Sequence, residues 1–280
     1  MPLPSSGQIS LNQIHVEAGG SSSSQASLND ADIRSMIGKS SGATNSFSDY
    51  HGITNSAPTA LYIGRSVTTG NGFPNGFPLT NSGNYSPLSS GQKVVVVALA
   101  LAGPSNTYVN LGSTAMTQAC KIDTPSSNPS IWQGGPTSAI YWVETTTSGS
   151  VYISGNGGSG RSVLHVWEIT GYNSATPFST ATAQNTDASS FSKIISVSTK
   201  FNGCTIGTGV TEDTFPLNSV TVSNSDSLQQ IDLESATNHY SWRDEGTAEG
   251  TTNYDCDQNS PNSNLNPNST IQQLAAAHWK

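Results

Sequence analysis

Short apolar runs alternate with clusters of Gly, Pro, Asn and Ser along most of the chain after residue 60. Runs of this length between turn signals predict antiparallel strands of a sandwich or barrel. No helical pattern of normal length separates them, which argues against a βαβ layout. Strands are predicted over 61–67, 93–102, 108–111, 115–122, 139–145, 151–154, 163–170, 178–183, 194–198, 205–210, 219–223, 228–233 and 271–279.

Two of these runs predict buried strands. Residues 94–102 are continuously apolar, as expected of a central strand that is covered on both faces. In residues 163–169 the side chains expected on both faces of the strand are largely apolar, and Trp167 is the expected core anchor. The closing run 275–279 also suits a helix, but a strand there would complete the sandwich.

The first fifty residues follow a different pattern, in which one phrase occurs three times. Its copies are Ser10-Leu11-Asn12-Gln13, Ser27-Leu28-Asn29-Asp30 and Ser46-Phe47-Ser48-Asp49. Ser, Asn and Asp cap helices by accepting from free backbone N–H groups, so each copy predicts a short helix. The clearest helical pattern belongs to the middle copy, with Leu28, Ile33, Met36 and Ile37 near one face and Gly38 as a stop.

Links rich in Gly and Ser, 19–24 and 40–42, join the three copies. Isolated turns with such links have few apolar side chains, which predicts a segment that has no core and is disordered on its own. We therefore expect residues 1–56 to form a docking arm that another chain holds in place. Residues 57–280 are expected to form one β-sandwich domain.

The arm resembles the N-terminal segment of many tailed-bacteriophage virion proteins, notably tail fibres. The matching residues are Gly7, Ile9, Ser10, Leu11 and Ile14, then Ser27, Leu28, Asn29, Asp30, Ile33 and Arg34, then Ser46, Ser48, Asp49, Tyr50 and Gly52. The resemblance implies an anchor on a tail, baseplate or head. The docking residues that it implies are Ile9, Leu11, Ile14, Leu28, Asp30, Ile33, Phe47, Asp49 and Tyr50.

The rest of the chain resembles a β-sandwich domain that recurs in phage structural proteins. The resemblance lies in VVVALALAG, VNLGSTAMTQ, VLHVWEITGYNSATPFSTATA and the closing LAAAHWK. It implies a jelly-roll type of fold and no chemistry. The predicted fold class is therefore an all-β, antiparallel, jelly-roll-like sandwich after an extended N-terminal arm with short helical turns.

Composition and charge narrow the function. Only 10% of residues are charged and the formal net charge is −8, without a cluster of Lys and Arg that could neutralise phosphates, so we expect no nucleic-acid partner. The N-terminus lacks the pattern of a signal peptide, and no apolar run approaches the ~20 residues of a membrane span. We expect a protein that is assembled into a virion in the bacterial cytoplasm, without membrane insertion.

No motif predicts catalysis, a cofactor or a metal site. The three cysteines, Cys120, Cys204 and Cys256, are too few and too scattered for a disulfide framework or a zinc site. Cys120 and Cys204 lie in strand-like runs, which predicts buried free thiols there. Gly155 to Gly160 fit G-x-G-x-x-G, but the residues that follow are strand-like, which predicts a hairpin loop. The histidines show no metal-ligand spacing.

Two segments leave alternatives open. Asn-Gly-Phe-Pro occurs twice in succession, and the rings of Phe73 and Phe77 either contact a receptor or subunit or cover the end of the sandwich. Residues 244–259 gather Asp244, Glu245, Glu249, Asp255 and Asp257 into an expected loop, which carries solvated charge or, less favoured, a calcium site. Trp242 beside it could stack on a sugar.

Together these features predict a non-enzymatic tail fibre or fibre-like appendage, assembled as a homotrimer, that contacts other virion proteins and a host surface glycan or protein. The alternatives are a capsid-decoration or collar protein and, less favoured, a tailspike that binds or degrades polysaccharide.

Overall fold

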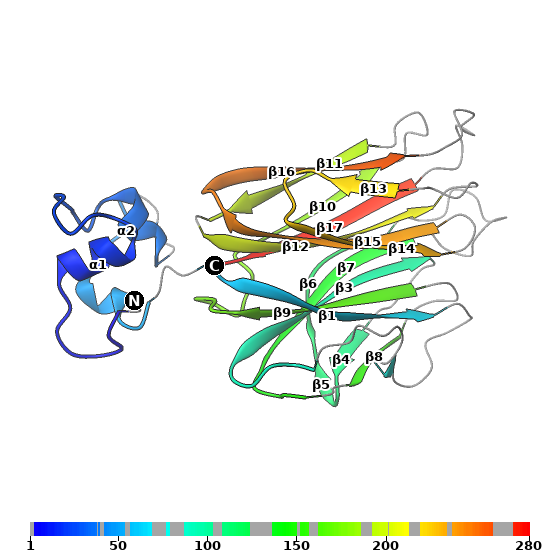
Figure 1. The fold of residues 1–280 in the computed structure, drawn as a ribbon, viewed down its shortest axis with the longest axis horizontal. Helices are drawn as coiled ribbons and strands as arrows, with labels where there is room; N and C mark the ends of the chain where they lie inside the picture. The colour runs from blue at the N-terminus through cyan, green and yellow to red at the C-terminus, as the bar shows by residue number, and fades with distance from the viewer. Residues whose placement is uncertain are drawn as a thin grey trace.

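Most of the described residues after residue 58 lie in strands that run lengthwise, and a small helical unit lies at one end of them (Figure 1). The computed structural model describes residues 3–37, 39, 42–53, 57–68, 77–78, 87–102, 108–123, 136–149, 152–156, 162–185, 192–200, 202–212, 219–233, 237–259 and 271–280. The expected boundary at residue 56 falls in 54–56, outside these ranges. The predicted antiparallel all-β sandwich is confirmed.

The helical unit contains one short helix for each copy of the repeated phrase. These are α1 (Leu11–Glu17), α2 (Ala31–Ser35) and the 3-10 helix η1 (Phe47–Tyr50). The prediction that every copy starts a short helix is confirmed.

The strands from β1 to β17 form the body of the protein, and its first half, β1 to β9, contains two sheets. The inner sheet has the order β1-β9-β3-β7-β6, with β1 (Thr59–Thr68), β9 (Ser162–Thr170), β3 (Lys93–Ala102), β7 (Pro136–Thr145) and β6 (Thr117–Asp123). The outer sheet has the order β2-β8-β4-β5, with β2 (Phe77–Pro78), β8 (Tyr152–Asn156), β4 (Tyr108–Leu111) and β5 (Thr114–Ala115).

The second half repeats this plan. Its inner sheet has the order β10-β17-β12-β15-β14, with β10 (Ser179–Asn185), β17 (Ile271–Trp279), β12 (Gly203–Glu212), β15 (Thr237–Thr247) and β14 (Ser227–Leu233). Its outer sheet has the order β11-β16-β13, with β11 (Ser192–Thr199), β16 (Gly250–Asn259) and β13 (Ser219–Val222).

The two halves share one topology. In each inner sheet the strand that begins the half in sequence, β1 or β10, pairs with the strand that ends it, β9 or β17. That last strand also pairs with the third strand of the half, β3 or β12, and this is the arrangement of a jelly roll. The register agrees as well: Val94 pairs with Ile169 in the first half, and Cys204 pairs with Trp279 in the second, 110 positions later in both strands. The range expected to form one sandwich therefore contains two jelly rolls in tandem.

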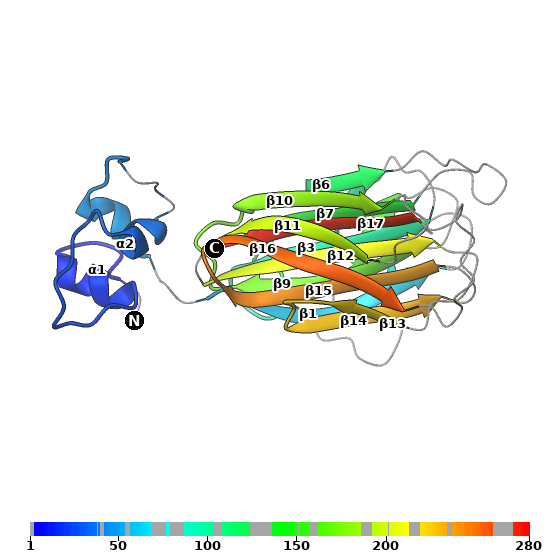
Figure 2. The same cartoon turned by 90° about the horizontal axis from the view of Figure 1, so that it is seen from above.

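The two rolls pack through their inner sheets, so that four sheets are stacked (Figure 1). Figure 2 shows the same stack from above, with the strands of the sheets overlapping. One hydrophobic core lies between the inner sheets, and each roll has a second core between its inner and outer sheets. Each inner sheet is consequently covered on both faces. This explains the apolar run in β3, where Val94 and Val96 face the other roll while Val95 and Val97 face their own outer sheet.

Side chains also hold the rolls together by hydrogen bonds. The Trp167 indole N–H on β9 donates to the Ser241 hydroxyl on β15 at 2.8 Å, and Ser241 donates to the carbonyl of Gly207 at 2.8 Å. Trp167 is completely buried, as predicted. At the edge of the first roll, both backbone groups of Ala60 bond to side chains of the second roll, those of Arg243 and Glu245.

The interface between the rolls encloses His165, and this predicts acid sensitivity. Burial, with the nearby His239 as a lesser cause, lowers the pKa of His165 to about 3. The folded protein therefore keeps this imidazole neutral while the unfolded chain takes up a proton below pH ~6.5. Stability that is fully present above that pH is lost as the pH falls toward 3, with a slope of up to about 1.4 kcal/mol per pH unit.

The measurement is the free energy of unfolding at several pH values between 7 and 4. We expect the wild type to lose more stability per pH unit than His165→Gln, whose side chain does not titrate. His278, whose pKa burial lowers to about 4, leaves a slope of the same sign in the variant. Parallel curves for the two proteins would contradict this account of His165.

The segment 244–259 corrects the expectation of an acidic loop. It belongs to β15 and β16, which cross from the inner to the outer sheet through the turn at Ala248 and Glu249. Tyr254 and Cys256 point into the core, and Asp255 and Asp257 alternate with them on the other face of β16. Within the described ranges no group of three or more His, Cys, Asp or Glu could hold a metal ion.

The two ends of the body differ. The helical unit joins the end at which β1 begins, and Trp279 and Thr170 also lie at that end. At the opposite end, strand ends such as Ala102, Glu212 and Asn259 border the connections 103–107, 124–135, 186–191, 213–218 and 260–270, which lie outside the described ranges. In sequence these connections are rich in Asn, Ser, Pro and Gly.

Candidate functional site

Each copy of the repeated phrase closes the same hydrogen-bonded turn in the helical unit. The backbone N–H of the Ser donates to the side chain three positions later: Ser10 to Gln13 at 2.8 Å, Ser27 to Asp30 at 2.7 Å, and Ser46 to Asp49 at 2.7 Å. In the first and third copies the Ser side chain also caps the helix, which completes a capping box. The phrase is therefore a helix-starting device that is used three times.

The three turns bring their apolar residues into one core. Ile14, Ile33 and Tyr50 have no exposed surface, and Leu3, Ala18 and Met36 are buried with them. Ile9, Leu11, Ala26, Leu28, Ile37 and Ile53 pack around these residues. This corrects the expectation that the segment has too few apolar side chains for a core, because the core draws on all three copies at once.

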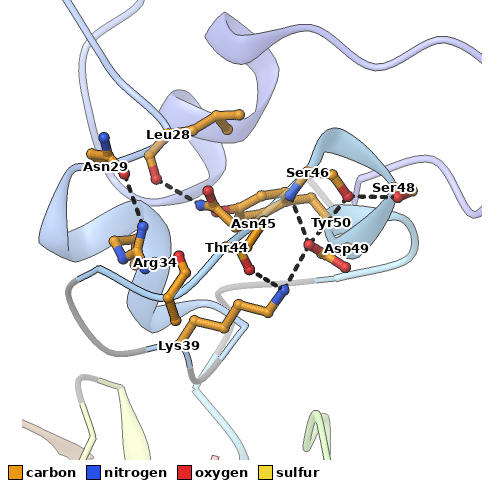
Figure 3. Close-up of polar contacts among 11 residues, drawn as sticks. Leu28, Asn29, Arg34, Lys39, Thr44, Asn45, Ser46, Ser48, Asp49 and Tyr50 are labelled. Carbon is orange, nitrogen blue, oxygen red and sulfur yellow. Dashed lines mark hydrogen bonds and ion pairs between the residues drawn. The ribbon is translucent and has the colours of Figure 1, made fainter.

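A buried arginine connects the second copy to the third (Figure 3). Arg34 is 3% exposed, and its guanidinium donates to the Asn29 side chain at 2.9 Å and to the carbonyl of Ala43. The Asn45 amide donates to the carbonyl of Leu28 at 2.7 Å and to the Tyr50 hydroxyl at 2.8 Å. The motif residues thus hold the loop before η1 against α2.

An ion pair fixes the third turn. The Lys39 ammonium lies 2.8 Å from Asp49 and also donates to the carbonyl of Thr44 at 2.8 Å (Figure 3). The hydrogen bond from Lys39, together with the backbone N–H of Ser46, lowers the pKa of Asp49 below its ordinary value. Burial raises the pKa of the Tyr50 phenol. Asp49 is therefore held ionised, and Tyr50 neutral, at physiological pH.

The Ser-rich link 21–24 has internal hydrogen bonds of its own. Ser24 bonds to the carbonyl of Ser21 through both its N–H and its hydroxyl, and the hydroxyl also lies 2.7 Å from Nε2 of His15. Gly20 packs so closely on the His15 ring that a Cβ would overlap it. These contacts order the link without a second chain.

The two ends of the unit pair with each other. The N–H of Leu3 donates to the carbonyl of Ile53 at 3.0 Å, and the N–H of Gly52 donates to the carbonyl of Pro4 at 3.0 Å. Between the unit and the body lies a hollow of about 450 Å³, whose lining includes Ile37 and Ile53 from the unit and Phe178, Lys200 and Lys280 from the body. Across it the Asn173 amide donates to the carbonyl of Met36 at 3.4 Å.

Most of the nine docking residues that the resemblance implies have structural roles inside the unit. Ile14, Ile33 and Tyr50 are fully buried core residues. Ile9, Leu11 and Leu28 are half-buried against them, and Asp30 and Asp49 close turns. Phe47 alone of the nine is exposed, at 41%.

The other contact candidates lie in the body. Phe73 is outside the described residues, and Phe77 belongs to β2, paired with Ile153. Trp242 is completely buried between β15 and the outer sheet, with the Tyr254 ring centroid 6.0 Å away. The expectation that Trp242 offers its ring to a sugar is therefore wrong.

The chemistry-bearing residues of the body are built into its sheets. Cys204 is a buried free thiol, as predicted, and Cys256 is buried as well. Cys120, for which burial was also predicted, is half-buried, and its burial raises the pKa of its thiol to about 12. Burial raises the pKa of Asp244 to about 6 as well, and its carboxylate accepts from the Tyr254 hydroxyl at 2.7 Å. Gly155 and Asn156 end β8 in the outer sheet, and β9 begins at Ser162 in the inner sheet. The two strands do not pair with each other, so the prediction of a hairpin at the Gly-rich motif is wrong.

Among the described residues no helix is both long and apolar enough to cross a membrane. Comparison of the chain with protein-family models, with curated proteins and with solved structures gave no match.

Proposed function

We propose that this chain is a structural protein of a tailed-phage virion, a tail fibre or fibre-like appendage. Its helical unit attaches to the tail, baseplate or another virion protein, and the opposite end of the body contacts a glycan or protein of the host surface. Self-association as a homotrimer and the absence of enzymatic activity belong to the same proposal.

The observation that carries this proposal is the difference between the two ends of the molecule. One end bears a small unit with its own core, whose repeated phrase resembles virion anchors. At the other end the rigid strands of both rolls border long connections that are rich in Asn, Ser and Gly. Recognition surfaces are commonly built from loops that a rigid scaffold positions. A protein with two dissimilar ends is suited to join two different partners.

The surface of the body agrees with a role outside a close-packed shell. The large apolar side chains that are exposed in the described ranges are single residues on different elements: Leu61, Tyr108, Phe178 and Ile194 in the body. Scattered exposed residues of this kind do not form a broad subunit interface. A homotrimer of this chain would therefore use a small part of the described surface.

Competition for the host surface tests the proposal. Purified chain, added in excess to host cells, is expected to slow the adsorption of particles in proportion to its concentration. A decoration or collar protein would leave adsorption unchanged, and this result would overturn host attachment. Release of reducing ends from host envelope glycan would instead identify a polysaccharide-degrading tailspike.

A further inference from the structure

The three copies of the repeated phrase provide an internal comparison for one position, the apolar residue after the Ser. Leu11, Leu28 and Phe47 occupy this position. The same backbone-to-side-chain hydrogen bond closes all three turns. Leu11 and Phe47 are both the first residue of a helix with a Ser N-cap, and Leu28 precedes Asp30, the N-cap of α2. Leu11 is therefore the most direct comparison for Phe47.

The surroundings differ in the third copy. Leu11 and Leu28 are half-buried and pack against the core of the unit. Phe47 has a larger apolar side chain than these leucines, yet 41% of its surface is exposed. A ring in solvent forgoes hydrophobic stabilisation that the two equivalent leucines obtain.

The turn that presents Phe47 is firmly held. Ser46 and Asp49 form the capping box, Asp49 is paired with Lys39 at 2.8 Å, and the next residue, Tyr50, is fully buried. A side chain on such a fixed turn loses little conformational freedom when it is covered. Exposed aromatic side chains in a rigid setting are frequent energetic centres of protein interfaces.

The residues beside the ring define the chemistry of the partner. Ser46 and Ser48 flank it with neutral hydroxyls that lie 2.7 Å from each other, and the Asp49 charge is matched by Lys39. Phe47 is thus an exposed ring whose neighbours in the sequence are neutral, and the charge that follows them is paired. An uncharged apolar hollow, with hydrogen-bonding groups at its rim, complements such a ring.

We propose that Phe47 is the anchor by which the helical unit binds another virion protein, inserted into an uncharged apolar hollow of that protein. This inference rests on the proposed function and makes it more specific. Of the nine residues that the resemblance implies, eight build the unit and Phe47 makes the contact.

The test compares variants supplied to particles whose own copy of this gene is deleted, with the number of chains per purified particle measured by mass spectrometry. Phe47→Ala is expected to melt like the wild type and to bind assembling particles on the order of thirty-fold more weakly, as for loss of an interface hot spot. Ile194→Ala removes an apolar side chain of the body that is 51% exposed, slightly more than Phe47, and is the matched control. It is expected to be incorporated normally.

The outcomes separate the two proposals. Wild-type chain absent from particles would overturn the proposed function and this inference together. Wild-type chain present, with Phe47→Ala incorporated equally or Ile194→Ala lost equally, would overturn the inference alone. Light scattering on the purified chain decides the partner: equal masses for wild type and Phe47→Ala are expected, and a smaller mass for the variant would show that the ring packs on a second copy.

Discussion

Replacing Trp167 by Ala is expected to lower the free energy of unfolding of the body by about 3–5 kcal/mol, the range for a large aromatic core residue. The indole has no exposed surface and lies in the core shared by the two rolls. The variant leaves a cavity there and deprives the buried Ser241 hydroxyl of a donor at 2.8 Å. Equilibrium unfolding in guanidinium chloride, followed by circular dichroism, measures the loss.

Ser241→Ala separates packing from hydrogen bonding at the same place. It removes the acceptor of the indole N–H but keeps the ring in the core, so its expected cost is about 1–3 kcal/mol. Trp167→Ala should therefore cost clearly more than Ser241→Ala. A loss below about 1 kcal/mol for Trp167→Ala would mean that the rolls do not depend on this shared core.

Replacing Ile33 by Ala is expected to unfold the helical unit and leave the body folded. Truncation of a buried Ile costs about 2–5 kcal/mol. A unit of this size has a total stability of only about 3–7 kcal/mol, at the usual free energy per residue. Amide hydrogen exchange read by mass spectrometry should show lost protection in peptides from residues 10–37 and unchanged protection in β3 and β12.

Val16→Ala is the control within the same unit. Val16 is 46% exposed on α1, so its truncation should leave exchange unchanged. If Ile33→Ala retained full protection in α1 and α2, the shared core would contribute little to the order of the unit.

The sequence was sufficient to predict strands whose two faces are both apolar. The predicted bounds of β3 and β17 agree with the structure, because both lie in inner sheets that are covered on both sides. The sequence did not predict β15 and β16, because Asp, Asn and Glu are spread along both strands and are typical of loops. The buried residues between them, Trp242, Tyr254 and Cys256, are the signal that indicates strands.

The tandem architecture could not be read from the chain because the equivalent strands share an alternation and not a sequence. Val94 and Cys204 occupy equivalent positions, as do Ile169 and Trp279, without chemical likeness beyond being apolar. The core of the helical unit was missed for a related reason. Each copy alone offers few apolar residues, whereas Ile14, Ile33 and Tyr50 meet only when the three turns fold together.

An image of the assembled particle, at a resolution that places the chain, is the most direct test of the account. The account predicts that the helical unit lies against another particle protein with the ring of Phe47 covered. The strand ends at Ala102, Glu212 and Asn259 should then point away from the particle. A chain in the opposite orientation, with those strand ends against the particle and the helical unit in solvent, would contradict it.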